Sequence, residues 1–484
     1  MATNRFDLFQ FGFDDAYVEL REAPNLLRTG YFDVSNVEDR ILQRHHFLVL
    51  GYKGSGKSMV SARFQLLAKD SPTHYAAGRA ITIREMALKD FRNIIPASFE
   101  APARAFWSWV LFLLVRTLEQ LESDGRASAE SRKNVGEAIK TLRDHQIISS
   151  SPRSLQKLKT ARMTVENTPA RFLDQTWQLD QRMSDQNINV WLRYLETVCS
   201  SFRSSRNHII FVDGLDDLGP VNEGHATLVG GLIQAAAHVN DIVREGEAPI
   251  KVVVCCRTDL FERLDLPMKG KLRSTFGVEL NWYQDPRRAE KSSLVGLANQ
   301  RARILDHGLS SIFDGSFLPS RIDNQPAARF LSMVTRHTPR DFLALLRNIQ
   351  QFSSGPGVLD RDAILSGARQ YSQVYFIGEM EDALDSYFSG PQKLVVRQAL
   401  GKLRSRTFDR IQFARAIDVA AARTKVDPEE ALHALFECSF VGSGSVSESG
   451  EKYYRFRHRN PTVSVADQDT FELHPGLWKA YNLA

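Results

Sequence analysis

The chain has 484 residues, which is too long for one ordinary domain, so we expect two or three. A hydrophobic content of 43% and a charged content of 25% are typical of a soluble globular protein and exclude a largely disordered chain. The net charge of +5 permits a basic patch but does not by itself imply nucleic acid as a partner.

Export and membrane insertion are not expected. The N-terminal stretch MATNRFDLFQFGFDD lacks a basic region followed by an apolar core, so we expect no signal peptide. The most apolar segment, residues 106–115, has about half the length that spans a bilayer, and we expect a buried helix there. The cysteines show no metal-binding spacing, which indicates a reducing, cytoplasmic location; they are Cys199, Cys255, Cys256 and Cys438.

Residues 47–64, FLVLGYKGSGKSMVSARF, predict a strand, a glycine-rich turn and a helix. Phe47 to Leu50 form a short apolar run that is typical of a buried parallel strand. Val60, Phe64 and Leu67 share one face of the predicted helix. The turn between strand and helix matches the spacing G-x-x-x-x-G-K-S of a phosphate-binding loop.

The glycine loop has the chemistry of a phosphate cradle. Its glycines let successive main-chain N–H groups point at phosphate oxygens, and the helix after the loop adds its positive N-terminal end. We expect Lys57 to reach the β- and γ-phosphates and Ser58 to ligate Mg²⁺. The predicted ligands are therefore ATP and Mg²⁺, and the predicted binding residues are Gly51, Lys53, Gly54, Ser55, Gly56, Lys57, Ser58 and Met59.

The next elements are a strand, a helical insertion and a second buried strand. We expect a strand at residues 78–83, GRAITI, and mostly helices over residues 100–206. Within the insertion, residues 123–160 are polar and in places basic, which indicates an exposed region. Its charges form either a solvated face or a contact with a partner or nucleic acid.

The second buried strand, residues 208–213, ends in an acidic side chain. In phosphate-binding-loop proteins a carboxylate at this point holds magnesium through water, so we expect Asp213 to be the second metal ligand. Asp216 or Asp217 could then orient the water that attacks the γ-phosphate.

Three arginines lie next to further predicted elements. Arg257 comes directly after a buried strand at residues 250–256, and Arg273 precedes a short strand at about residues 278–280. Arg340 begins a predicted amphipathic helix whose apolar face comprises Phe342, Leu345, Leu346 and Ile349.

The order of these elements resembles that of AAA+ and STAND-type ATPases, over roughly residues 30–350 and the C-terminal domain. The resemblance implies an α/β P-loop NTPase fold with a five-stranded parallel sheet of the additional-strand type, followed by a helical lid. It also implies that the ligand lies at the carboxyl ends of the strands. Many such ATPases carry glutamate directly after the metal-binding aspartate. Here Gly214 takes that place, so hydrolysis should be slow unless Asp216 substitutes.

The resemblance also gives each arginine a role. Arg257 falls where the sensor 1 residue lies, beside the γ-phosphate. KLRSTFGVEL resembles the arginine box of origin-recognition and replication-loader ATPases, in which Arg273 would reach a neighbouring subunit's nucleotide. RHTPRDFLALLR resembles their sensor 2 helix, with Arg340 as its arginine. Those loaders usually carry asparagine at sensor 1, and arginine there is more typical of STAND proteins. For Arg257 and Arg273 an ordinary surface arginine is the alternative.

The leading segment, residues 1–46, mixes aromatic and acidic side chains. A similar segment packs near the adenine in related ATPases, so Tyr31 or Phe32 could stack on the base. Alternatively, these aromatic side chains only attach the segment to the core.

The C-terminal part is predicted to be a winged helix. Residues 391–425 hold nine Lys or Arg against two acids, and Asp427 and Pro428 predict the start of a further helix. SFVGSGSVSESGEKYYRFRHR then predicts two strands joined by a turn. Duplex DNA is one possible partner, with phosphates meeting Arg455, Arg457 and Arg459. The last helix is acidic at its start, which favours a protein-binding or intramolecular role instead.

Four parts are expected: residues 1–46 packing on the core, the ATPase core 47–290, a helical lid 291–390 and the winged helix 391–484. The predicted function is a slow ATP-dependent switch that forms homo-oligomers and controls a separate effector, as in bacterial phage-defence regulators. The alternative is a DNA-loading or DNA-remodelling ATPase. A small-molecule kinase is a third class, but such an enzyme needs neither the lid nor the winged helix.

Overall fold

The computed structural model describes residues 5–43, 45–82, 101–144, 148, 184–215, 223–283, 286–353, 355–421, 424–446, 452–460, 462–465 and 470–483. Contacts divide the chain into two compact units. Unit 1 comprises Met1–Ser35, Gly51–Met59 and Leu280–Ala484, and unit 2 comprises Asn36–Leu50 and Val60–Glu279. Each unit buries its own set of apolar side chains.

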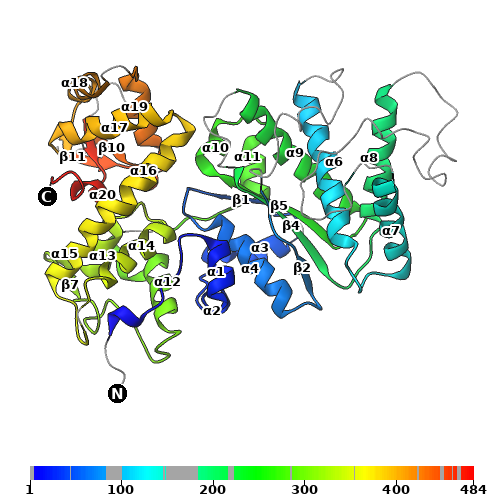
Figure 1. Cartoon of the computed structure of the whole chain (residues 1–484), viewed down its shortest axis with the longest axis horizontal. Helices are drawn as coiled ribbons and strands as arrows, with labels where there is room; N and C mark the ends of the chain where they lie inside the picture. Colours follow the sequence, from blue (N-terminus) through cyan, green and yellow to red (C-terminus); the bar gives the residue numbers. More distant parts are fainter. Residues whose placement is uncertain are drawn as a thin grey trace. The chain divides into compact units, whose positions relative to one another are not determined.

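Unit 2 is built on a parallel sheet with the strand order β2-β4-β5-β1-β6. Figure 1 labels its strands β1, β2, β4 and β5. The long central strands β4 and β5 are buried almost throughout, which is the pattern of parallel strands covered on both faces. The predicted α/β fold class is therefore confirmed. The strands are β1 (Leu48–Gly51), β2 (Tyr75–Ala77), β3 (Ile81–Thr82), β4 (Asn207–Asp213), β5 (Ile250–Arg257) and β6 (Gly277–Glu279).

The edge of this sheet differs from the expected strand at residues 78–83. Two short strands pair with β4 instead: β2 aligns Ala77 with Ile209, and β3 aligns Ile81 with Val212. The residues between them, which begin with Gly78, leave the ladder. Glycine has no side chain to pack in a strand, which explains why the predicted strand is interrupted at this position.

The helical insertion of unit 2 contains α6 (Ala101–Leu121), α7 (Ala129–Asp144) and α8 (Ser184–Ser200), and α6 and α8 both pack on α9 (Glu223–Glu245). The apolar run at 106–115 lies within α6, where Trp109 is buried and donates a hydrogen bond to the Leu228 carbonyl at 2.9 Å. The predicted buried helix is confirmed. Among the described residues, no helix is long and apolar enough to cross a membrane.

Unit 1 contains a group of helices that we call the lid. Its third helix, α14, begins with a cap: the Thr338 hydroxyl accepts a hydrogen bond from the Asp341 amide at 3.2 Å, and proline occupies the first turn. The apolar face predicted for this helix, from Phe342 to Ile349, is fully buried. The lid helices are α12 (Ser293–Ala302), α13 (Ala327–Met333), α14 (Pro339–Gln350), α15 (Arg361–Gln370) and α16 (Ile377–Ala383).

The leading segment is bound to the lid. Arg301 of α12 is buried, donates to the Phe11 carbonyl at 2.6 Å and pairs with both oxygens of buried Glu19 at 2.7 and 3.0 Å. Gln350 at the end of α14 donates to the carbonyls of Phe6 and Phe9 at 3.0 and 2.8 Å. These polar contacts bind the first part of the segment, up to Ser35, into unit 1, whereas residues from Asn36 on belong to unit 2.

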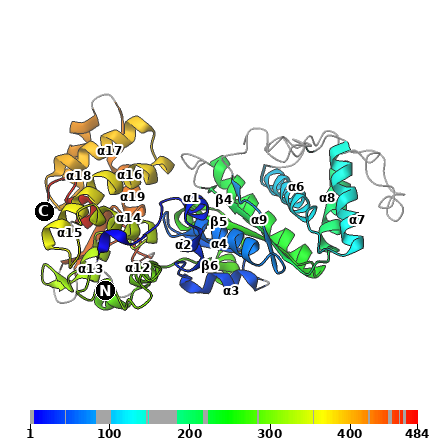
Figure 2. The ribbon, with the colours of Figure 1, turned by 60° about the horizontal axis from the view of Figure 1, so that its bottom comes forward.

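The C-terminal part of unit 1 has the predicted winged-helix arrangement, and Figure 2 shows α17 and α18 side by side. Asp427 caps α19 by accepting from the Glu429 amide at 3.0 Å, as the sequence predicted. Two short strands, β9 and β12, extend the predicted hairpin into the antiparallel sheet β11-β10-β12-β9. The elements are α17 (Gly390–Leu403), β9 (Thr407–Phe408), α18 (Arg410–Ala421), α19 (Pro428–Glu437), β10 (Val441–Val446), β11 (Lys452–Arg455), β12 (Phe471–Leu473) and α20 (Pro475–Trp478).

Candidate functional site

The glycine loop leaves β1 at Gly51 and ends at Lys57, where α4 (Lys57–Asp70) begins. Gly54 and Gly56 have φ angles of 82° and 98°, which residues with a side chain rarely adopt. A Cβ atom at Gly54 would also lie 3.1 Å from the Thr338 hydroxyl oxygen, so the loop passes close to the start of α14. Left-handed residues alternating with ordinary ones are typical of turns whose N–H groups converge on an anion.

The Lys57 ammonium group lies inside this loop. It donates hydrogen bonds to the carbonyl oxygens of Gly51 at 3.0 Å and Tyr52 at 3.2 Å, and the residue is only 6% exposed. The positive charge therefore sits at the N-terminal end of α4, where the helix dipole is also positive. The Ser55 hydroxyl is buried without a hydrogen-bond partner among the described residues. An oxyanion in the loop would provide that partner, so the residues present fit a phosphate group.

Two of the predicted residues end strands at one edge of the sheet. Asp213 is the last residue of β4 and Arg257 the last of β5. Because the strands are parallel, these residues lie at the same edge as the carboxyl end of β1. Asp213 is buried, at 5% exposure. Asp216 and Asp217 lie outside the described residues.

Two of the predicted arginines are held by carboxylates of their own unit. The buried Arg257 guanidinium donates to both oxygens of Asp259, at 2.9 and 2.5 Å. Arg273 pairs with Glu262 and Glu279 while keeping 31% of its side chain exposed. Arg257 is therefore oriented by the helix that follows its own strand, α10 (Thr258–Arg263), whereas Arg273 remains partly exposed.

Within unit 1, the glycine loop is hydrogen-bonded to two residues from later in the chain. The Arg340 amide donates to the Gly54 carbonyl at 3.3 Å, and the Trp282 indole N–H donates to the Ser55 carbonyl at 2.8 Å. The Phe32 ring lies 6.0 Å from the Trp282 ring, between centroids. The Tyr31 carbonyl accepts from Gln300 of α12 at 2.7 Å. Phe32 is thus next to the ring that contacts the loop.

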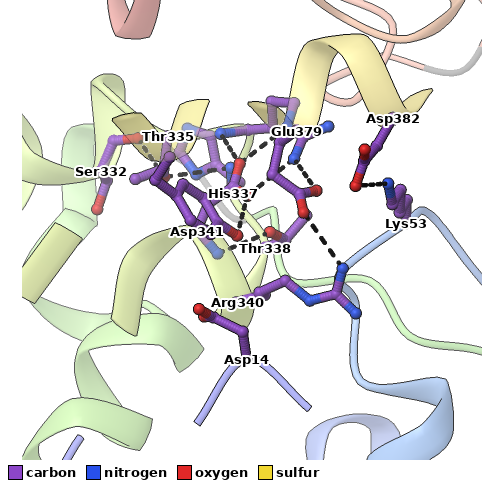
Figure 3. Close-up of polar contacts among 12 residues, drawn as sticks. Asp14, Lys53, Ser332, Thr335, His337, Thr338, Arg340, Asp341, Glu379 and Asp382 are labelled. Atoms are coloured by element: carbon purple, nitrogen blue, oxygen red, sulfur yellow. Dashed lines mark hydrogen bonds and ion pairs between the residues drawn. The ribbon is translucent and has the colours of Figure 1, made fainter. Parts of the chain in front are cut away.

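A network of charged side chains lies at the start of α14 (Figure 3). Arg336 donates to both oxygens of Asp341 at 2.8 Å and to Glu379 Oε2 at 3.0 Å. The other oxygen of Glu379 accepts from Arg340 Nη1 at 3.5 Å. Nearby, Lys53 of the glycine loop pairs with Asp382 at 3.2 Å.

Burial and charge set the protonation states in this network. Burial alone would lower the pKa of Arg336, but the charges of Asp341 and Glu379 outweigh it and raise that pKa well above its ordinary value. Burial alone would raise the pKa of Glu379. The positive charges of Arg336, Lys53 and Arg340 outweigh that effect and lower it. Glu379 is therefore a carboxylate at neutral pH.

The predicted phosphate-contacting arginines of the winged helix differ in their surroundings. Arg455 is exposed. Arg457 donates to the Val463 carbonyl at 2.7 Å and pairs with Glu437 at 3.4 Å. Arg459 lies partly buried against His458 and Met333. The expectation that all three side chains face phosphate needs correction, because two of them are bound within their own unit.

Three residues beside the loop were not predicted from the sequence: Trp282, Glu379 and Asp382. Trp282 comes shortly after the last strand of the sheet, and its position alone could have suggested a contact with the loop after β1. Glu379 and Asp382 belong to no motif, and Asp382 lies 329 residues along the chain from Lys53. Ion pairs between such distant residues leave no pattern in a single sequence.

No protein-family model matches the chain. No curated protein matches it either. Among solved structures, it is similar to the Aeropyrum pernix ORC1 protein in complex with DNA, with 13% identity, coverage of 98% of this chain and 97% of that one, and a TM-score of 0.39. It is also similar to Drosophila ORC bound to DNA, with 10% identity, 97% and 90% coverage and a TM-score of 0.31. It is also similar to the Aeropyrum pernix ORC2 protein in ADPNP-ADP complexes, with 11% identity, coverage of 96% of this chain and 95% of that one, and a TM-score of 0.30. All three structural similarities are loose.

Proposed function

We propose that the chain binds ATP with Mg²⁺ at the glycine loop and hydrolyses it slowly, as a switch. The observation that carries this proposal is the loop itself. It extends from the inner strand β1 of a parallel sheet and buries the Lys57 ammonium against its own carbonyl oxygens. A buried cation at a helix N-terminus, beside a hydroxyl without a partner in the described chain, suits a polyphosphate.

In this proposal, Lys57 exchanges its two carbonyl partners for oxygens of the β- and γ-phosphates. The main-chain N–H groups from Gly54 to Ser58 hold the remaining phosphate oxygens. Ser58 and Asp213 would hold Mg²⁺, which would supply positive charge against the phosphate oxygens. Phe32 offers an apolar ring for the adenine base.

The proposed turnover is slow because the residue directly after Asp213 is a glycine. Gly214 has no side chain to activate water, so the catalytic carboxylate would have to come from Asp216. Arg257, Arg273 and Arg340 are proposed to respond to the γ-phosphate, Arg273 from a neighbouring copy of the chain. Nucleotide state would then control self-association and an effector protein, as in phage-defence regulators.

The nucleotide site is tested by titrating Mg-ATP into the full chain by calorimetry. Lys57→Ala should abolish measurable binding, since it removes the buried cation. Lys69→Ala is the matched control, because Lys69 is exposed in the last turn of the same helix. Equal affinity in wild type and Lys57→Ala would refute the site.

DNA remodelling is the second candidate function. Its supporting observation is the exposed basic side chains among the described residues of the winged helix, which comprise Arg397, Lys402, Arg404, Arg406, Arg415, Lys425, Lys452 and Arg455. Phosphate contacts should give an affinity for duplex DNA that falls steeply between about 50 and 200 mM salt. Arg455→Ala should weaken that binding, whereas Arg457→Ala should act mainly through the lost pair with Glu437. No binding at low salt would exclude this candidate.

A further inference from the structure

Helix α16 presents two carboxylates to two cations beside the glycine loop. Glu379 and Asp382 are three residues apart and therefore lie on one face of the helix. Glu379 contacts Arg340 at 3.5 Å, and Asp382 contacts Lys53 at 3.2 Å. Burial would raise the pKa of Glu379, and the charges of Arg336, Lys53 and Arg340 together lower it. Figure 3 shows the two pairs side by side.

The Glu379 carboxylate has one firm contact and one weak contact. Its Oε2 atom accepts from Arg336 at 3.0 Å, and Arg336 is itself fixed by Asp341 and by the rings of Phe376 and Phe440 at 5.5 and 4.8 Å. Its Oε1 atom lies 3.5 Å from Arg340, which is long for a hydrogen bond between charged groups. Arg340 can therefore leave Glu379 without leaving that carboxylate buried and unpaired.

Both pairs are weak enough for their cations to change partner. Arg340 starts α14 and bonds through its main chain to Gly54, and its side chain is 30% exposed. Lys53 is itself a loop residue, and its partner Asp382 is 62% exposed, so solvent weakens that pair. A polyphosphate in the loop carries more negative charge than either carboxylate and offers several acceptor oxygens.

We propose that Glu379 and Asp382 are positioning residues that occupy Arg340 and Lys53 until phosphate groups replace them. This inference rests on the proposed nucleotide site. The two carboxylates oppose binding of a nucleoside triphosphate, and its phosphates displace them from the cations. α16 is released from the loop as a result.

The released helix is connected to the winged helix. Glu381 on the same helix pairs with Arg397 of α17 at 2.9 Å, and Asp385, just after it, pairs with Lys393 of α17. The Cys438 thiol, at the end of α19, lies 3.7 Å from the Ala383 carbonyl. A change in the charge partners of α16 thus reaches the winged helix through contacts within unit 1.

The test is the affinity of the full chain for Mg-ATP, Mg-ADP and AMP, measured by calorimetry. Glu379→Gln keeps the shape and removes the charge, and it should tighten ATP binding by about fivefold, the size expected from one partly buried ion pair. The affinity for AMP, which carries a single phosphate, should be nearly the same in wild type and Glu379→Gln. Asp362→Asn, which removes an exposed charge on α15 outside this cluster, should leave ATP affinity unchanged.

A double-mutant cycle separates this role from a merely structural one. If Glu379 acts through Arg340, the gain should vanish in Arg340→Gln/Glu379→Gln relative to Arg340→Gln alone. Glu379→Asp, which keeps the charge, should retain wild-type affinity. Unchanged or weaker ATP binding by Glu379→Gln would overturn the inference, as would a gain that persists without Arg340. If wild type and Lys57→Ala both fail to bind ATP, the proposed function itself fails, whatever Glu379→Gln does.

Discussion

Arg336 and Asp341 form a bidentate ion pair at 2.8 Å in which both side chains are almost completely buried. The same arginine lies over the rings of Phe376, in the lid, and Phe440, in the winged helix. The pair therefore fixes the point where the lid and the winged helix meet. Its planar, two-fold geometry is specific to arginine and carboxylate.

Asp341→Ala should destabilise unit 1 by about 3–5 kcal/mol, because it leaves the buried Arg336 charge with Glu379 as its remaining carboxylate partner in the described network. The free energy of unfolding in urea measures this. Asp362→Ala is the control, since Asp362 is 94% exposed on α15 and should cost less than about 0.5 kcal/mol. Equal costs for the two variants would contradict the importance of the buried pair.

Trp282→Phe should weaken both folding and nucleotide binding. Loss of the indole N–H leaves the Ser55 carbonyl without its 2.8 Å donor, at a cost of about 1–3 kcal/mol if that oxygen stays buried. Trp478 is a matched control, because its indole donates to the Leu473 carbonyl at 2.7 Å, away from the loop. Trp478→Phe should lower stability similarly and leave Mg-ATP affinity unchanged. If both variants changed Mg-ATP affinity equally, Trp282 would have no specific role at the nucleotide site.

The sequence predicted the elements whose signals are local. Apolar runs identified β4 and β5, and the glycine spacing identified the loop between Gly51 and Lys57. The predicted strand at 78–83 was partly wrong because β2 and β3 are very short and only half buried, so they carry little hydrophobic pattern. Apolar burial along α14 was read correctly because its helical period is strong.

The charge partners could not be read in the same way. Arg457 and Arg459 look like free basic side chains in the sequence, but Glu437 and His458 hold them once the chain folds. The pairing of Lys53 with Asp382 depends on the fold that brings α16 to the loop. A side chain's charge is local information, whereas its partner is a property of the tertiary structure.

Stability should fall as the pH drops below about 6.5, because unit 1 buries three neutral histidines. Burial lowers the pKa of His337 to about 3 and the pKa values of His458 and His474 well below the ordinary value, and the Arg459 charge adds to this for all three. The unfolded chain takes up protons that the folded chain excludes. Each histidine then costs about 1.4 kcal/mol per pH unit below about 6.5.

Glu472 opposes this trend, since burial raises its pKa to about 7 and the folded chain takes up a proton there as the pH falls. One carboxyl offsets only one of the three histidines, so the net slope keeps its sign. The dependence of the free energy of unfolding on pH is measured by urea unfolding at about pH 7.5, 6.5 and 5.5. His337→Gln should make this dependence weaker. A free energy of unfolding that stays constant between about pH 6.5 and 5.5 would contradict the prediction.

Asp213→Asn should uncouple magnesium from nucleotide binding. In the proposed site Asp213 holds the metal through water, and loss of such a group typically costs about 10–100-fold in metal affinity. ATP affinity should therefore rise with Mg²⁺ in wild type and rise much less in the variant, while affinity in EDTA stays similar. Asp241→Asn is the control, because Asp241 is 52% exposed on α9. The same magnesium dependence in both variants would remove Asp213 from the metal site.

Arg273→Ala should lower ATP turnover only where copies of the chain associate. Within one chain Arg273 is paired with Glu262 and Glu279 and is partly exposed, so its loss should leave a monomer's turnover nearly unchanged. In other NTPases an arginine supplied by a partner contributes on the order of 10³–10⁵ in rate. Turnover is measured at protein concentrations below and above the onset of self-association, as followed by light scattering. Arg263 is an exposed arginine of α10 (Thr258–Arg263), and Arg263→Ala should leave ATP turnover unchanged in both the monomer and the associated protein. If Arg273→Ala lowered the turnover of the monomer as much as that of the associated protein, Arg273 would act within one chain.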